Sequence, residues 1–354
     1  MKKHLFIPSL MTLALLFTAC DEKPKPVAPS SEEPIDVWVV SEGSWHSNNA
    51  EITAYNSASG SVIPDYFSRQ NGRGLGDVAN DILIYGSKAY VVVNISSTLE
   101  VLDTRNGKSL RQLTFFDERQ TARQPRRICA GSGKVYLCCF DGSVLRIDTA
   151  TLTVEAMGSA GSNPDGICLS NGKLYVSNSG GLNFPNYDST VSVMDPVSLQ
   201  TLKTIRVRLN PMRSLSDCYG HVWVMSAGNY KEIAGCVQCI DSETDSVIAV
   251  YEGGVMDFDG CGSALYLMYY DENSRKMRCD CIDAVSLQRR GTLFATGDLT
   301  LPYGISVREK DGTIWITDAL DYASNGNVHC FDQSGNQLHR FEAGFCPKRI
   351  AFIE

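Results

Sequence analysis

The chain has 354 residues, of which 43% are hydrophobic and 20% are charged, and its formal net charge is −8. This acidic balance excludes a general attraction to nucleic acid or to an anionic bilayer surface. The length is enough to bury a large core as one or two domains.

The N-terminus has the pattern of a bacterial lipoprotein signal. Two lysines precede an apolar run over residues 5–17, which is shorter than the roughly 20 residues that span a bilayer. A small pair, "TA", stands directly before Cys20, the position at which such proteins receive lipid. We expect residues 1–19 to be a cleaved signal peptide and Cys20 to carry the anchor; the alternative is an ordinary signal with a chance cysteine.

Residues 20–36 predict a flexible tether. The stretch "DEKPKPVAPSSEEPID" holds four prolines and several charges without an apolar period, so it favours an extended linker. The acids directly after the cysteine resemble the tag of lipoproteins that some gut bacteria send to the cell exterior. The expected location is therefore the outer membrane, with attachment by lipid alone and the outer face favoured.

One strand motif recurs along the rest of the chain. Its versions are "KAYVVVN" (88–94), "KVYLCCF" (134–140), "KLYVSNS" (173–179), "HVWVMSA" (221–227), "ALYLMYY" (264–270) and "TIWITDA" (313–319). Each is followed by a strand that ends in aspartate: Asp103, Asp148, Asp195, Asp241, Asp283 and Asp332. Four short strands at a period in the forties are typical of a β-propeller blade. We expect the aspartates to bind the backbone of the next turn rather than to catalyse.

The two ends of the chain complete one further blade. Innermost strands are predicted to begin near Val78, Arg126, Asp165, Met212, Val255 and Pro302, which makes six. Three strands precede them (37–43, 50–56 and roughly 63–69), and one strand (348–354) follows. Pairing these ends removes an exposed sheet edge. We predict an all-β, seven-bladed propeller over residues 37–354, closed by N- and C-terminal strands in one blade.

Loops on one face of such a propeller vary most and are the usual place for binding. Those between second and third strands, and those leading into innermost strands, carry aromatic and polar side chains that suit a large, partly apolar ligand. The candidate rim residues are Trp45, His46, Arg73, Asn94, Arg126, Phe140, Asp165, Asn178, Tyr187, Arg213, Tyr230, Asp257, Tyr270, Tyr303, Asp318 and Tyr322. The alternative is that surface loops simply contain such residues.

Catalytic and metal motifs are missing from the sequence. There is no G-x-S-x-G, no H-E-x-x-H and no G-x-G-x-x-G after a strand, and His46 is the one histidine in a rim loop. We therefore expect a binding protein without a cofactor, not an enzyme. The twelve cysteines after Cys20 are expected to be small buried hydrophobes, with one or two disulfides left open.

The repeat resembles the YVTN-type (YncE-like) propeller repeat of bacterial surface proteins over nearly all of residues 37–354. Two stretches, beginning "SEGSWHSNNAEITAYN" and "LPYGISVREKDGTIW", are similar to propeller lipoproteins of gut bacteria, a group that includes the BtuG-type cobalamin-binding proteins. The resemblance implies a cell-surface lipoprotein that captures a cobalamin or related corrinoid on the rim. It also implies transfer of the ligand to a TonB-dependent outer-membrane transporter.

Two other functions stay open. A glycan-binding or lactonase-like propeller could hold calcium through Asp81, Asp165 and Asp257, although three arginines (127, 213 and 349) at the same level oppose a divalent ion. The acid pair Asp318 and Asp321 is better explained by loop hydrogen bonds. A scaffold that binds only protein is the third possibility.

Overall fold

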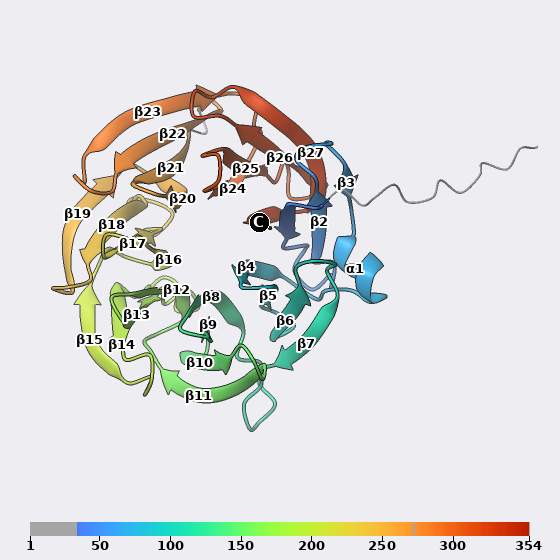
Figure 1. The fold of residues 1–354 in the computed structure, drawn as a ribbon. Coiled ribbons are helices and arrows are strands. Elements are labelled where there is room, and N and C mark those ends of the chain that lie inside the picture. The colour runs from blue at the N-terminus through green and yellow to red at the C-terminus, as the bar shows by residue number, and fades with distance from the viewer. Residues whose placement is uncertain (1–33, 272, 354) are drawn as a thin grey trace, which may run out of the picture. The chain divides into compact units, whose positions relative to one another are not determined.

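The computed structural model describes residues 34–271 and 273–353, so the predicted signal peptide, Cys20 and nearly all of the tether lie outside the described residues. Residues 35–353 form seven four-stranded antiparallel sheets arranged as blades around a central axis (Figure 1). This confirms the predicted seven-bladed, all-β propeller. The described part of the chain contains one helix, α1 (Tyr66–Asn71), and no helix in it is long and apolar enough to cross a membrane.

Within blades 1 to 6 the strands run outward from the axis in chain order. Blades 1 and 2 are β4 (Ala79–Tyr85), β5 (Lys88–Val93), β6 (Thr98–Asp103) and β7 (Ser109–Thr114), then β8 (Pro125–Gly131), β9 (Lys134–Cys139), β10 (Ser143–Asp148) and β11 (Thr153–Ser159). Blades 3 and 4 are β12 (Pro164–Ser170), β13 (Lys173–Asn178), β14 (Thr190–Met194) and β15 (Thr201–Arg206), then β16 (Pro211–Ser216), β17 (His221–Ser226), β18 (Cys236–Asp241) and β19 (Ser246–Glu252). Blades 5 and 6 are β20 (Val255–Cys261), β21 (Ala264–Asp271), β22 (Lys276–Asp283) and β23 (Arg289–Thr296), then β24 (Pro302–Val307), β25 (Ile314–Asp318), β26 (Asn325–Phe331) and β27 (Gln337–Phe345).

Blade 7 closes the ring with both ends of the chain. Its sheet order is β28 (Pro347–Phe352), β1 (Val37–Ser41), β2 (Glu51–Tyr55) and β3 (Val62–Ile63), so the last strand is the innermost. Val39 of β1 pairs with Ile350 of β28 in an antiparallel ladder. Figure 1 shows the red C-terminal end next to the dark-blue strands from the start of the described chain. The predicted closure by N- and C-terminal strands is confirmed.

The recurring apolar motif is explained by its place in the blade. Each version is a second strand, and β5, β9, β13 and β17 all have the same burial, with every residue after the first buried. Such a strand packs against neighbouring blades through both faces, so its sequence is a continuous apolar run rather than an alternating one. Outer strands such as β7 and β19 are largely exposed or alternate in burial.

The aspartates that close the third strands have the structural role expected of them. In all six, a side-chain oxygen accepts a hydrogen bond from the backbone N–H two residues later, at 2.8–3.0 Å. These are Asx turns, which begin the tight connection to the outer strand. The predicted turn-forming role is therefore confirmed.

One predicted strand is wrong. The stretch 63–69 was expected to be the third strand of the closing blade, but pairing stops at Ile63 and helix α1 follows. The helix places Tyr66 and Phe67 in the core, where the Tyr66 ring lies 5.5 Å from the ring of Trp38. Gly72, at φ +67, ends it in a left-handed cap. Tertiary packing of the two aromatics and this cap override the local strand pattern.

The twelve cysteines among the described residues are free thiols. Nine are buried and only Cys218 is exposed. Burial raises the pKa of several, to about 12 for Cys138 and Cys330. Most therefore act as the small core residues that the sequence predicts.

Candidate functional site

Two adjoining cavities lie at the end of the central axis where the second-to-third loops gather, and we call this region the mouth. The rim cavity has a volume of about 500 Å³ and is lined by residues of blades 1, 2, 3, 6 and 7. The axial cavity, about 430 Å³, is lined by residues of the innermost strands. Glu42, Arg126, Tyr303 and Tyr322 line both, so the two form one continuous recess.

The mouth is built on a feature that every blade shares. At the start of each innermost strand the pairing register skips, so that one or two residues have no partner on the next strand. Such β-bulges redirect a side chain out of the regular ladder. In every blade the second residue of the innermost strand is bulged in this way. The seven residues are Asn80, Arg126, Asp165, Met212, Met256, Tyr303 and Lys348.

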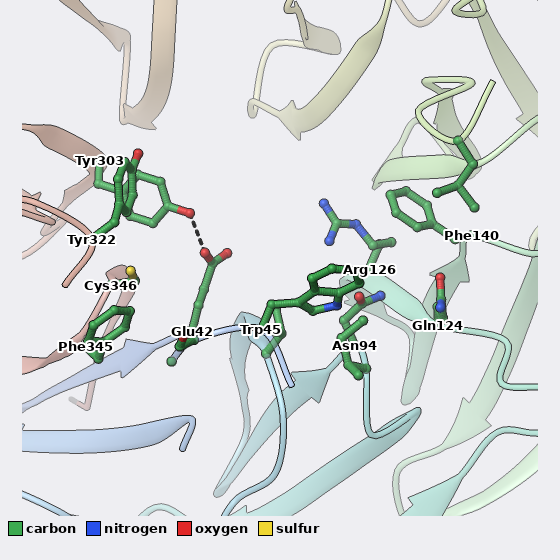
Figure 2. Close-up of a pocket in the computed structure, with 15 residues that line it drawn as sticks. Glu42, Trp45, Asn94, Gln124, Arg126, Phe140, Tyr303, Tyr322, Phe345 and Cys346 are labelled. Carbon is green, nitrogen blue, oxygen red and sulfur yellow. Dashed lines mark hydrogen bonds between the residues drawn. The ribbon is translucent and has the colours of Figure 1, made fainter. Parts of the chain in front are cut away.

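Polar bulge residues form a hydrogen-bonded arc around the mouth. Asp165 accepts two bonds from Arg126, at 2.9 and 3.0 Å, and a third guanidinium nitrogen of Arg126 donates to Asn80 at 2.9 Å. The amide of Asn80 donates to Glu42 at 3.0 Å, and the Tyr303 hydroxyl donates to the other oxygen of Glu42 (Figure 2). The arc therefore joins blades 1, 2, 3, 6 and 7.

Blades 4 and 5 have methionine at the bulge, where the blades of the arc have polar or charged residues. Met212 of blade 4 and Met256 of blade 5 stand at the equivalent bulges and line the axial cavity. The Tyr230 hydroxyl lies 3.6 Å from the Met212 sulfur. Thioethers are polarisable and adapt to irregular apolar surfaces. One side of the mouth is thus polar and the other apolar.

A second layer of side chains, one residue further along the innermost strands, fills the axis beneath the mouth. Asp257 accepts hydrogen bonds from Arg213 at 2.9 Å and from Arg349 at 2.8 Å. Arg127 lies 3.7 Å from Asp81, and Arg213 also pairs with Asp259 at 3.0 Å. Three arginines and three aspartates therefore balance in charge.

The ionisation of this layer follows from burial and pairing. Burial opposes the carboxylate form of Asp257, but Arg349 and Arg213 outweigh it and lower its pKa. Burial raises the pKa of Asp259, which Arg213 offsets only in part. Burial, together with Arg213, lowers the pKa of Arg349 to about 10. The layer is a fixed ionic floor under the cavities.

Aromatic rings surround the recess. Figure 2 shows Tyr303, Tyr322 and Phe345 facing Arg126 and Phe140 across the rim cavity. Trp45 is 69% exposed and its ring stacks on His46 at 4.2 Å between centroids. The guanidinium of Arg126 lies over the Phe140 ring at 4.3 Å. Exposed, preoriented rings of this kind are contact platforms for a ligand with an apolar face.

The structure brings together about half of the residues predicted from the sequence. Those that line the recess are Trp45, Asn94, Arg126, Phe140, Tyr230, Asp257, Tyr303 and Tyr322. Asp165 and Arg213 do not line it, but they are the ionic partners of Arg126 and Asp257, which do. Tyr187 supports Tyr230 edge-on, with 6.2 Å between ring centroids, and His46 supports Trp45.

Four predicted residues do not join the recess. Arg73 pairs with Glu100 of β6 at 2.8 Å, so it faces the outer part of blade 1. Asn178 is buried and bonds Thr190 and Ser192 within its own blade. Asp318 accepts the backbone N–H groups of Thr300 and Leu301, in the loop that leads into β24. The Tyr270 hydroxyl donates to the Thr300 carbonyl at 2.9 Å. Hydrogen bonds and ion pairs within the blades and their loops therefore occupy these four side chains.

Several residues of the recess were missed. Glu42 and Lys348 line the axial cavity, with Leu182, Phe345 and Cys346 in the rim cavity. The signal was present in the repeat: the residue after the first position of each innermost strand is the bulged one. Aligning the five innermost strands that begin with proline at "P-x" would have selected Lys348 after Pro347, as it selects Arg126 after Pro125.

Comparison with known proteins supports the fold alone. No family model and no curated protein matches the chain. Among solved structures, a quinoprotein alcohol dehydrogenase-like protein from Bacteroides thetaiotaomicron is similar at 14% identity and a TM-score of 0.67, covering 90% of this chain and 78% of its own. A protein of unknown function from Desulfotomaculum acetoxidans matches at 11% identity and a TM-score of 0.67, and the match covers 90% of this chain and 98% of that protein. Hydrazine synthase of Kuenenia stuttgartiensis matches at 16% identity and a TM-score of 0.55, and the match covers 70% of this chain and 74% of that protein.

Proposed function

We propose that this propeller is a capture protein for a cobalamin or related corrinoid, as in the BtuG-type lipoproteins that its sequence resembles. The observation that carries the proposal is the two-sided mouth: a polar arc from Asp165 to Tyr303 opposite the sulfur atoms of Met212 and Met256. A corrinoid has a broad apolar macrocycle edged by amide side chains. Its face matches the aromatic and sulfur surfaces, and its edge matches the arc.

The electrostatics of the recess favour binding over hydrolysis or proton transfer. Arg126, Arg213 and Arg349 are each held by a carboxylate within 3.0 Å, so they are positioned rather than available as acids or bases. Preorganised donors of this type orient a ligand's amides without rearranging. A binding protein needs nothing further.

The calcium-dependent alternative meets a specific obstacle. Asp165 and Asp257, which would supply ligands, are already bonded to arginine at 2.8–2.9 Å, and Asp81 lies 3.7 Å from Arg127. Guanidinium groups at this distance oppose a divalent cation. A glycan that stacks on Trp45 or Tyr322 remains the competing ligand, and it is an outcome of the test below.

Membrane attachment is also part of the proposal, and only the sequence supports it. A lipid on Cys20 and the tether of residues 20–36 would hold the propeller beside an outer-membrane transporter at high effective concentration. This placement gives a tightly bound, scarce ligand a short route to its importer.

The test is calorimetric titration of a soluble protein beginning at residue 21 with cobalamin, haem and oligosaccharides. Trp45→Ala and Tyr322→Ala should each weaken cobalamin binding by about tenfold or more, as truncation of anchor aromatics does. Tyr219→Ala is the matched control, because this tyrosine is similarly exposed but lies on the β16–β17 turn, at the opposite face. Absence of cobalamin binding in the parent protein, with binding of a glycan, would replace the corrinoid by a carbohydrate.

A further inference from the structure

Lys348 differs from the other cations of the mouth in its lack of a carboxylate partner. Arg126, Arg127, Arg213 and Arg349 each have an aspartate oxygen within 4.0 Å. Within residues 34–271 and 273–353, no carboxylate oxygen lies that close to the Lys348 ammonium. The structure gives this group one hydrogen bond, donated to the backbone carbonyl of Tyr303.

The surroundings of Lys348 hold the ammonium in place without neutralising it. It occupies the bulge of β28, its Nζ lies 4.0 Å from the centre of the Tyr303 ring, and it lines the axial cavity. A lysine ammonium has three donor protons, and one of them is used by the carbonyl. Two donors therefore remain for a group that enters the cavity.

We propose that Lys348 anchors an anionic oxygen group of the ligand, a phosphodiester or a carboxylate, in the axial cavity. Resting on the proposed function, this assigns Lys348 to the phosphodiester of the nucleotide loop, which cobalamin carries and cobinamide lacks. Lys348 then separates complete corrinoids from those without the loop, while the aromatic rings contact the macrocycle that both share.

The pH dependence of this contact follows from the groups that face the lysine. Burial is the main cause that lowers the pKa of Lys348, which is about 8. Asp257 of β20 and Glu42 after β1 oppose the shift, and Arg349 and Arg127 add to it. Tyr303 of β24 stays neutral, because burial and Glu42 raise its pKa. Anion binding needs the protonated amine, so it should weaken as the pH rises through 8.

The experiment compares the protein from residue 21 with its Lys348→Met and Lys348→Arg variants by calorimetry, using cobalamin and cobinamide. Methionine keeps an apolar stem of similar length and arginine keeps the charge. We expect Lys348→Met to lose about tenfold or more in affinity for cobalamin and little for cobinamide, with Lys348→Arg close to the parent. From pH 7 to pH 9 the cobalamin affinity of the parent should fall by up to about tenfold, the change in the protonated fraction for a pKa near 8.

A purely structural lysine predicts other results. Lys348→Met would then lower the melting temperature and affect both corrinoids equally, which would overturn the proposal. Removing a cation whose pKa is depressed should instead leave the melting temperature at pH 7 unchanged or raised.

Small anions separate this inference from the corrinoid proposal. Dimethyl phosphate and acetate are each titrated into the protein while the NMR signals of the Lys348 side chain are followed. A response to the first indicates a phosphodiester site, and a response to the second indicates a carboxylate site. A response lost in Lys348→Met supports the anion site even if no corrinoid binds, in which case the corrinoid proposal alone fails. If neither anion changes these signals and Lys348→Met binds cobalamin as tightly as the parent, Lys348 is not an anion-binding residue.

Discussion

Substituting Asp257 by asparagine tests whether the ionic floor holds the ring together. The Asp257 carboxylate is 1% exposed and accepts hydrogen bonds from Arg213 of blade 4 and Arg349 of blade 7. It also accepts the backbone N–H of Ile305, in blade 6, at 3.2 Å. One carboxylate of blade 5 therefore bonds the innermost strands of three other blades. Asparagine has the same shape but removes the charge.

The expected loss is set by burial. Breaking a buried ion pair from one side costs about 3–5 kcal/mol, because the remaining charge stays buried without compensation. Here Arg213 keeps Asp259 at 3.0 Å and Arg349 keeps Asp81 at 4.0 Å. We therefore expect Asp257→Asn to lower the unfolding free energy by about 3 kcal/mol, the lower end of that range.

A matched surface pair gives the control. Arg208 and Glu252 lie 3.0 Å apart, as close as the buried pair, but they are 60% and 58% exposed. Solvent-exposed pairs contribute about 0–1 kcal/mol, so Glu252→Gln should leave the unfolding free energy nearly unchanged. Guanidinium chloride denaturation followed by fluorescence measures both variants. Equal losses in the two would refute the role given to burial.

The pH profile checks the same reasoning independently. The folded pKa of Asp257 is below the ordinary value of 3.8, so its stabilising contribution is complete above that value. It is lost progressively as the pH falls below 3.8 toward the folded pKa. The parent should therefore lose stability in this acid range more steeply than Asp257→Asn. Parallel profiles would contradict the lowered pKa.

Three further outcomes are expected, two from the fold and one from the sequence of the N-terminus. Deleting residues 348–354 removes most of β28, which opens blade 7; thermal unfolding should shift sharply downward or aggregation should appear, and an unchanged melting curve would contradict closure by β1 and β28. Gly166→Ala should destabilise by about 1–3 kcal/mol, because the added Cβ would lie 2.0 Å from the Met212 carbonyl oxygen, whereas Gly74→Ala, which meets no atom within 4 Å, should be close to neutral in the same denaturation assay. If Cys20 carries the lipid, Cys20→Ala should move the protein from the membrane to the soluble fraction without unfolding it, and retention after a high-salt wash would argue against the anchor.

The fold could be predicted because each blade repeats a local pattern. A second strand such as Lys88–Val93 is apolar at nearly every position, and Asp103 marks the turn that follows the third strand. These signals are local in sequence and recur at intervals of 42 to 49 residues. Helix α1 escaped prediction because what stabilises it is a contact between Tyr66 and Trp38, which are separated in the chain.

The site could be predicted only in outline. The choice of face and of its aromatics followed from loop position, and Trp45, Tyr303 and Tyr322 do line the recess. Which polar residues face the recess depends on pairing between blades. Asp318 and Asn178 look like rim residues in the sequence but are used by loop backbone and by neighbouring side chains. Such pairing joins residues far apart in the chain and leaves no local pattern.

The bulge at the start of every innermost strand has a consequence for how this protein can change over time. A bulged residue takes no part in the strand ladder of its own blade, so replacing it leaves the sheet bonds intact. The seven positions are spread through the gene about one repeat apart, so each can be replaced by its own mutation. Arg126 bonds both Asn80 and Asp165, and these three are expected to change as a group. A library randomised at these seven codons would vary ligand preference on a constant scaffold, and natural divergence of such propellers has the same route open to it.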